Sequence, residues 1–201
     1  MRKQVRLSDP GALAAVGVSA LLAMPATASD SGSSRCSDID QSRRPSLDVV
    51  GLTSDPRLVC FNEFRPDKAT TIGFVAELSG GDTTLIGIDY RVQDGGLYGV
   101  GNVGGIYLLD VANAAATAFS RITVALDGTC FGVDFNPVAD RLRIFSDTGQ
   151  NLRHNVNVGG TTATDTALNY MTGVTALGVA GAAYTNNDLD PKTNTTLYAT
   201  A

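Results

Sequence analysis

The stretch 141–154 gathers the side chains best suited to bind a ligand. It contains Arg141, Arg143, Arg153 and His154, the only histidine of the chain. Guanidinium groups hold carboxylates and other acidic groups through paired, charge-assisted hydrogen bonds, so the cluster indicates an acidic ligand. The simpler interpretation, which we favour, is that these are solvated charges on a strand face, paired with Asp140 and Asp147. The stretch is still the best candidate ligand site in the sequence.

Two aspartates recur at equivalent places, Asp89 in Gly-Ile-Asp-Tyr and Asp134 in Gly-Val-Asp-Phe. A catalytic acid has no reason to recur with a repeat, whereas a hydrogen bond at a turn or strand end does. We therefore predict structural roles for both. Nothing in the sequence fixes their separation, so they are no evidence for the paired carboxylates of a glycosidase.

No metal site, cofactor or catalytic residue is predicted. One histidine cannot build a multi-histidine zinc or copper site. The sequence contains no nucleophile elbow, phosphate-binding loop or dinucleotide fingerprint in the required context. The loop Asn186–Asp190, followed by Asn194, offers oxygen ligands of the kind that calcium takes, but it lacks EF-hand spacing. Asn and Asp also build ordinary turns, which is the favoured interpretation here.

The three cysteines are Cys36, Cys60 and Cys130. Because their number is odd, at least one thiol is unpaired or bonded between molecules. Their spacings match neither a redox pair nor a zinc site. Cys60 and Cys130 adjoin apolar residues, which indicates that both are small buried side chains. Whether any disulfide forms is left open.

The elements that must position these residues are short strands, since apolar runs alternate with Gly, Asp, Asn and Thr turns. The runs recur with a period of 45 residues: Gly87–Tyr90 is answered by Gly132–Phe135, and Leu97–Val100 by Leu142–Phe145. A looser copy begins at Ala182, and an incomplete one opens the domain at Val49. Four strands in 45 residues are typical of one β-propeller blade. The prediction is an all-β, propeller-like array, with a β-sandwich or solenoid as the alternative.

Counting blades predicts that this array is incomplete. Residues 47–201 contain about 3.4 units of 45 residues, and closed propellers have roughly four to eight blades. The alternative is that four shorter blades close by pairing N-terminal with C-terminal strands.

Several segments resemble the domain-of-unknown-function family DUF4394. They include VGLTSDPRLVCF (50–61), GLYGVGNVGGIYLLD (96–110) and, most specifically, FGVDFNPVADRLRIFSDTGQNLR (131–153). The resemblance also covers GGDTTLIGIDYR (80–91) and AAYTNNDLD (182–190). It implies a secreted bacterial propeller-like domain without an assigned activity, so no catalytic residue can be carried over. It also implies that this sequence stops short of the family's C-terminal part.

The N-terminus has the three parts of a secretory signal peptide: a basic start, an apolar run from Gly11 to Met24, and Ala-Thr-Ala at 26–28. The apolar run is too short to span a membrane, and Pro25 ends it. The next residues are rich in Ser, Asp and Arg, which is typical of disorder. We expect a signal peptide over 1–28, a disordered lead-in over 29–46 and a repeat domain over 47–201.

Without residues 1–28 the chain has 12 basic and 19 acidic residues, a formal charge near −7. This balance argues against nucleic acid or an anionic membrane as the main partner. We therefore expect a secreted, extracellular or periplasmic protein, without membrane insertion after cleavage. Its expected role is non-catalytic binding of an unknown ligand, protein or glycan. The alternative is an exported hydrolase or lyase using a propeller funnel, with Arg143, Arg153 or His154 near the chemistry.

Overall fold

The computed structural model describes residues 2–7, 18–19, 48–171, 173–190 and 192–201. These residues form an all-β fold in which a single 3-10 turn, η1 (Pro66–Lys68), is the one helical element described. The predicted all-β class is confirmed. The predicted lead-in (29–46), Cys36 and most of the predicted signal peptide (1–28) lie outside the described residues.

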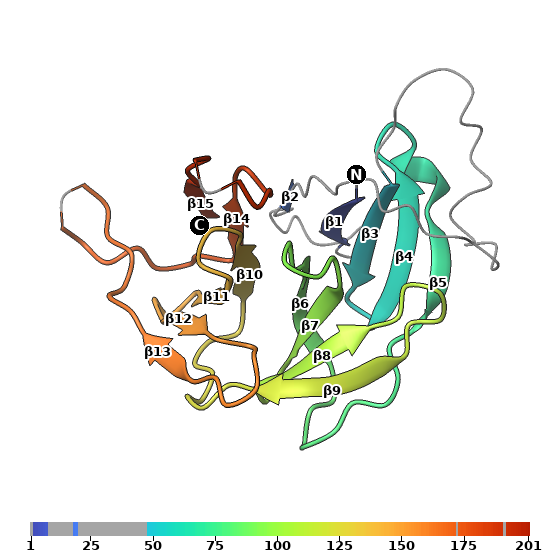
Figure 1. Cartoon of the computed structure of the whole chain (residues 1–201), viewed down its shortest axis with the longest axis horizontal. Coiled ribbons are helices and arrows are strands. Elements are labelled where there is room, and N and C mark those ends of the chain that lie inside the picture. Colours follow the sequence, from blue (N-terminus) through green and yellow to red (C-terminus); the bar gives the residue numbers. More distant parts are fainter. Residues whose placement is uncertain (1, 8–17, 20–47, 172, 191) are drawn as a thin grey trace.

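The described strands form four sheets that follow one another in chain order around an arc (Figure 1). The first sheet has the order β2-β1-β3-β4-β5, the second β6-β7-β8-β9, the third β10-β11-β12-β13 and the fourth β14-β15. The bounds are β1 (Arg2–Leu7), β2 (Val18–Ser19), β3 (Asp48–Thr53), β4 (Arg57–Asn62), β5 (Thr70–Phe74), β6 (Leu85–Tyr90), β7 (Leu97–Gly101), β8 (Gly105–Leu109), β9 (Ala116–Arg121), β10 (Phe131–Asn136), β11 (Arg141–Ser146), β12 (Asn151–His154), β13 (Thr162–Thr164), β14 (Gly181–Tyr184) and β15 (Leu197–Thr200).

The second and third sheets have the same strand order and matching register. Tyr90 pairs with Leu97 in the second sheet, and Phe135 pairs with Leu142 in the third. Tyr90 and Phe135 lie 45 residues apart, and so do Leu97 and Leu142, which is the period of the sequence. Equivalent side chains therefore point to the same face in the two sheets. The predicted propeller-like arrangement of four-stranded units describes these two sheets well.

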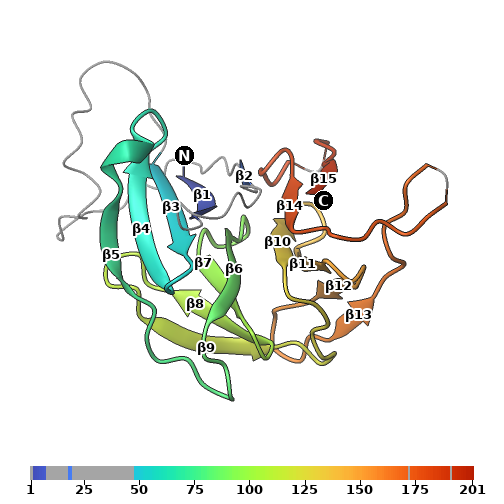
Figure 2. The ribbon, with the colours of Figure 1, turned by 180° about the vertical axis from the view of Figure 1, so that it is seen from behind.

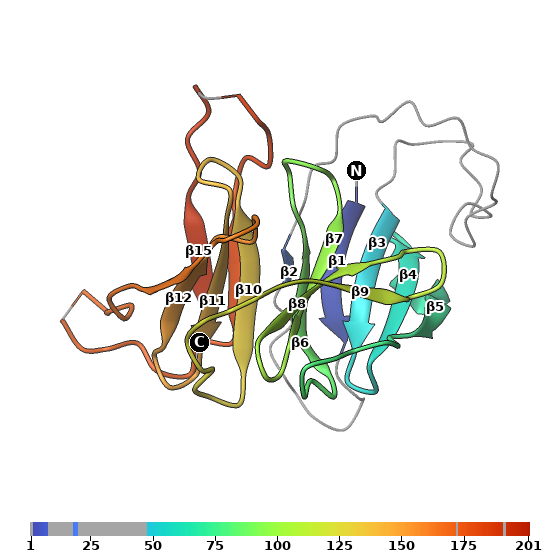
Figure 3. The same ribbon diagram turned by 60° about the horizontal axis from the view of Figure 1, so that its bottom comes forward.

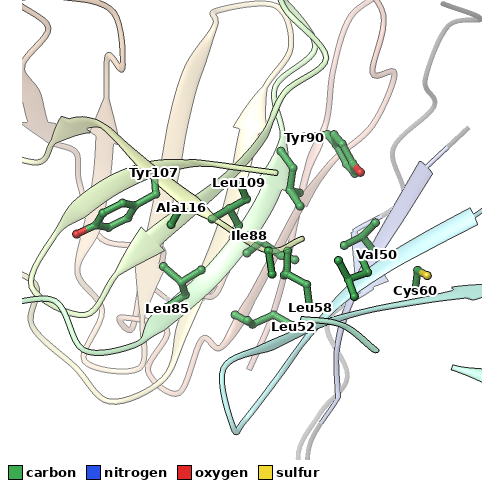
Figure 4. Close-up of a cluster of buried hydrophobic side chains, with 13 residues drawn as sticks. Val50, Leu52, Leu58, Cys60, Leu85, Ile88, Tyr90, Tyr107, Leu109 and Ala116 are labelled. Atoms are coloured by element: carbon green, nitrogen blue, oxygen red, sulfur yellow. The ribbon is translucent and has the colours of Figure 1, made fainter. Parts of the chain in front are cut away.

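Three apolar clusters lie between successive sheets. The first joins the first and second sheets, and Figure 4 shows Val50 and Leu58 approaching Leu85 and Leu109 from the opposite sheet. The second cluster joins the second and third sheets, and the third cluster joins the third and fourth. The second cluster includes Ile86, Tyr98, Val133, Leu142 and Leu152, and the third consists of Phe145, Ala176, Val179 and Ala182. Each sheet thus buries its faces against its neighbours, as blades do.

The first strands of successive sheets lie side by side on the inner side of the arc (Figures 2 and 3). β6 contacts β10, and β10 contacts β14. Glycine allows this close approach, because a Cβ built on Gly132 would lie 2.6 Å from the carbonyl carbon of Gly181. A Cβ on Gly87 would likewise lie 2.7 Å from a methyl carbon of Val133. The two recurring aspartates lie on these inner strands.

Candidate functional site

The predicted basic cluster forms one ion triad rather than an open anion site. Arg143 of β11 lies directly opposite Arg153 of β12. Like charges at paired positions repel each other, and here Asp165 lies between them. Nη1 of Arg143 donates to Asp165 Oδ2 at 2.5 Å, and Nη2 of Arg153 donates to Oδ1 at 3.1 Å. The partner of these arginines is therefore Asp165, and not Asp140 or Asp147 as predicted.

Arg143 is also used to join two sheets. Its Nε donates to the hydroxyl of Tyr184 in β14 at 3.2 Å, and Nη1 donates to Asn151 Oδ1 at 2.7 Å. The Arg143 side chain is 14% exposed and that of Arg153 is 46% exposed. Arg143 is thus committed to contacts within the domain, whereas Arg153 keeps part of its guanidinium in solvent.

His154 and Arg141 lie apart from this triad. His154 is fully buried, with Nε2 3.2 Å from Ser120 Oγ and Nδ1 3.0 Å from Thr162 Oγ1. Burial lowers the pKa of its imidazole. Arg141 donates to backbone carbonyl groups of its own turn. The structure therefore does not bring the four predicted residues together at one site.

An ion pair that the sequence did not indicate joins the second and third sheets. Buried Arg91, just after β6, donates from Nε to Asp140 Oδ1 at 2.7 Å and from Nη2 to Oδ2 at 2.5 Å. Its Nη1 donates to Asp94 Oδ2 at 2.9 Å, and Nη2 also reaches Asn157 Oδ1 at 2.7 Å. The guanidinium lowers the pKa of Asp140. This two-pronged pair is a structural clamp between neighbouring sheets.

The recurring aspartates link the inner strands. Asp89 Oδ2 accepts a hydrogen bond from the backbone N–H of Phe135, and Asp134 Oδ2 accepts one from that of Tyr184, both at 2.6 Å. Burial, followed by the nearby charge of Asp134, raises the pKa of Asp89. Their partners lie on the next sheet, and both are near the end of their strands: Phe135 is the next-to-last residue of β10 and Tyr184 is the last residue of β14.

The most prominent exposed feature is the hairpin of residues 168–177, between β13 and β14 (Figure 1). The Tyr170 N–H donates to the carbonyl of Val174, and Asn169 pairs with Thr175 in an isolated bridge. At the tip Tyr170 is 53% exposed, Val174 is 61% exposed and Met171 is fully exposed. The tip is therefore apolar and open to solvent.

The base of this hairpin is anchored in the third apolar cluster. Ala176 belongs to that cluster, Leu168 packs against it, and the Ala176 N–H donates to the carbonyl of Leu168 at 2.7 Å. Gly173 supplies the positive φ, 79°, that the turn requires. The hairpin thus combines a fixed base with an exposed apolar tip.

A concave surface lies at one end of the second sheet, between the loops β6–β7 and β8–β9. It is an open, mostly apolar cleft of about 350 Å³ whose lining includes Tyr90, Leu97, Leu108, Leu109, Val111 and Asp110. Pockets for small ligands begin at about this size. None of the residues predicted to bind a ligand lines it.

The Asn/Asp loop consists of side chain-to-backbone turns. Asp188 Oδ1 accepts from the N–H of Asp190, and Asp190 Oδ1 accepts from the N–H of Lys192, both at 2.9 Å. Among the described residues, no three His, Cys, Asp or Glu side chains are grouped to hold a metal ion. The favoured turn interpretation agrees with these contacts.

The two described cysteines differ. Cys60 is buried in the first apolar cluster, as predicted, and is disulfide-bonded. Cys130 is an exposed free thiol, so its predicted burial is wrong. Cys130 is the last residue of the loop before β10, and the buried residues of that strand begin at Phe131.

Comparison with protein families identifies the family of this chain, whereas comparison with individual proteins does not. No curated protein and no solved structure matches the chain. In the described part of the chain, no helix is long and apolar enough to cross a membrane. One family profile covers residues 57–200, which include all of the second, third and fourth sheets and the hairpin. The chain therefore belongs to the family described as a domain of unknown function, DUF4394.

Proposed function

We propose that this domain is a non-catalytic, exported module that binds another protein, and that the hairpin 168–177 is its binding element. The observation that carries the proposal is the apolar tip, where Tyr170, Met171 and Val174 are more than half exposed. Exposed apolar patches on soluble domains mark interaction sites more often than chance. Tyr and Met are also enriched at the centres of protein interfaces.

The anchored base suits the hairpin to binding. Ala176 and Leu168 attach its two arms to the third apolar cluster, so little chain entropy is lost when the tip meets a partner. Met171 adds an adaptable thioether side chain that can fit an irregular surface.

Export is supported by the cysteines and by the N-terminal pattern. Cys60 is disulfide-bonded, and disulfides persist mainly in oxidising compartments outside the cytosol. The acidic balance of residues 29–201 favours a protein partner over nucleic acid.

The alternative of a hydrolase or lyase gains no support from its candidate residues. Arg143 and Arg153 share Asp165, and His154 is enclosed between Ser120 and Thr162. These contacts join elements of the domain to one another, which indicates structural roles for these side chains.

Photo-crosslinking from single positions tests the proposal. A benzophenone amino acid replaces Tyr170 in one variant and the fully exposed Val158, on a different loop, in the control. In cultures of the producing cells, we expect one discrete protein adduct from position 170 and none from position 158. Met171→Ser combined with Val174→Ser, in the protein that carries the benzophenone amino acid at position 170, should leave the melting temperature unchanged and abolish capture of that same protein. Equal adducts from both positions, or none from position 170, would show that the hairpin is not the binding element.

A further inference from the structure

Among the residues that the structure describes, the first sheet has no antiparallel inner strand like those of its neighbours. β3, β4 and β5 correspond to β7, β8 and β9: β3–β4 and β7–β8 are both joined by turns of three residues. The pairings β4–β5 and β8–β9 each shift register at one place, after Leu58 and after Ile106, which lie 48 residues apart. No described strand of the first sheet corresponds to β6.

The place of that inner strand is taken by β1. β1 pairs with β3 in parallel over six positions, from Arg2 opposite Asp48 to Leu7 opposite Thr53. It also contacts β6, so it lies in the row of inner strands (Figure 3). The true inner strands β6 and β10 are both antiparallel to their neighbours. β1 therefore fills this position with the opposite polarity.

We propose that, once the predicted signal peptide has been removed, the inner edge of β3 is a strand-acceptor site that binds an extended segment of another polypeptide. The proposal depends on removal of residues 1–28, which include β1. Departure of β1 leaves one edge of β3 without a partner strand, while Val49, Val50 and Leu52 of that strand lie in buried surroundings. An unpaired, apolar strand edge binds extended peptides through main-chain hydrogen bonds.

The neighbouring sheets specify the chemistry of the bound segment. The inner strands read Leu-Ile-Gly-Ile-Asp-Tyr in β6 and Phe-Gly-Val-Asp-Phe-Asn in β10, so both contain Gly-apolar-Asp-aromatic. The glycine leaves room for the next inner strand, and the aspartate accepts a hydrogen bond from a backbone N–H of that strand. The partner is therefore a segment of this pattern, bound antiparallel to β3 and with its aspartate directed towards β6.

The chain just before β3 does not carry that pattern. The residues 45 positions before Leu85–Tyr90 are Asp-Gln-Ser-Arg-Arg-Pro at 40–45, without glycine or an apolar residue. Proline at the end of such a run also cannot donate to a strand ladder. Residues 40–45 therefore do not supply this strand, and the segment that we propose belongs to a separate polypeptide.

Peptide binding to the secreted protein tests the proposal. The probe is a fluorescent peptide of residues 83–91, TTLIGIDYR, added to protein purified from the medium whose N-terminus has been sequenced. We expect saturable binding, a raised melting temperature and slowed amide exchange in Val49–Thr53. Peptides carrying Gly87→Val or Asp89→Ala should bind about tenfold more weakly, because the first clashes with β6 and the second loses the acceptor for the backbone N–H.

The uncleaved precursor is the matched control. A variant in which Ala28→Phe blocks processing retains β1 and should bind no peptide. Equal binding by precursor and secreted protein, or by all three peptides, would place the peptide elsewhere and overturn the proposal. So would a secreted protein that still begins at Met1, or one that protects Val49–Thr53 without peptide and takes none up. In that last case the edge is filled by its own residues or by a second copy.

Discussion

The carboxylate of Asp89 on β6 accepts a hydrogen bond from the backbone N–H of Phe135 on β10, which is 46 residues further along the chain. The same relationship recurs one sheet on, between Asp134 and Tyr184. β6 and β10 belong to different sheets and share no strand ladder. These buried bonds therefore tie together inner strands that belong to different sheets.

Replacing Asp89 should change how stability depends on pH. Burial raises the pKa of Asp89 above 3.8, so the folded state keeps this proton at pH values where the unfolded chain has lost it. Its contribution to stability is therefore present at low pH and declines as the pH rises above about 3.8. Asp89→Asn keeps an oxygen acceptor for the Phe135 N–H and does not titrate. Urea unfolding from pH 3.5 to 7 should show the stability of the Asp89→Asn variant rising relative to wild type as the pH increases.

Asp89→Ala separates the hydrogen bond from the charge. Relative to Asp89→Asn, it leaves the buried N–H of Phe135 without its acceptor and should cost about 1–3 kcal/mol at every pH. If the stabilities of Asp89→Asn and wild type change in parallel from pH 3.5 to 7, the pKa of Asp89 is not raised in the folded protein.

The inner-strand aspartates were predictable because their signal is local and repeated. Period-2 alternation defines the strands, and the 45-residue offset brings Asp89 and Asp134 to equivalent places. Their exact partners were not predictable. A hydrogen bond to the next sheet depends on how closely two inner strands approach, and that distance is set by packing of whole sheets.

The candidate site was predicted poorly for a different reason. Arg153 and His154 are adjacent on a strand, and adjacent strand residues point to opposite faces. Alternation along β12 therefore places the side chains of Arg153 and His154 on opposite faces of the sheet. The Arg91–Asp140 clamp joins residues 49 apart that follow no repeat, so the sequence carries no signal for it. The hairpin 168–177 was not singled out from the sequence, since composition does not distinguish an exposed apolar loop from a buried strand.

The Arg91–Asp140 pair should contribute far more stability than an exposed pair. Asp140→Ala leaves the buried Arg91 guanidinium without its main partner, and breaking such a pair costs about 3–5 kcal/mol. Asp67→Ala is the control, because its pair with Arg65 is more than half exposed and should be worth less than about 1 kcal/mol. Because the pKa of Asp140 is lowered, its contribution is present above pH 3.8 and is lost as the pH falls. Chemical denaturation at pH 7 giving equal losses for the two variants would contradict this.

The two arginines of the triad should differ in importance. Arg143→Ala removes bonds to Asp165, Asn151 and Tyr184 at the contact of two sheets, and should cost about 2–4 kcal/mol. Arg153→Ala removes one half-exposed ion pair and should cost less than about 1 kcal/mol. Thermal melts at matched pH compare them. Equal losses would mean that Arg143 does not join the third and fourth sheets.

Cys130 should be the reactive thiol of the native protein. It is exposed and free, whereas Cys60 is buried and disulfide-bonded. Under native, non-reducing conditions, a maleimide should therefore modify Cys130 and leave Cys60 untouched, as read by peptide mass mapping. Cys130→Ser should remove that modification without lowering the melting temperature. Modification of Cys60 in the folded protein would contradict its disulfide.

His154 should titrate below its ordinary range and should make the domain sensitive to mild acid. It is fully buried between Ser120 and Thr162, and burial lowers its pKa from 6.5. The unfolded chain therefore takes up this proton first as the pH falls. Its contribution to stability is complete above about pH 6.5 and declines below that value.

Since His154 is the only histidine, its ring signals in an NMR titration are unambiguous. Its chemical shift should stay constant from pH 8 down through 6.5. His154→Gln is neutral at all these pH values and should flatten the loss of stability between pH 6.5 and 5, although it packs less well than the ring. A midpoint at or above 6.5, or an unchanged acid sensitivity in the glutamine variant, would show that the imidazole is not held neutral between the second and third sheets.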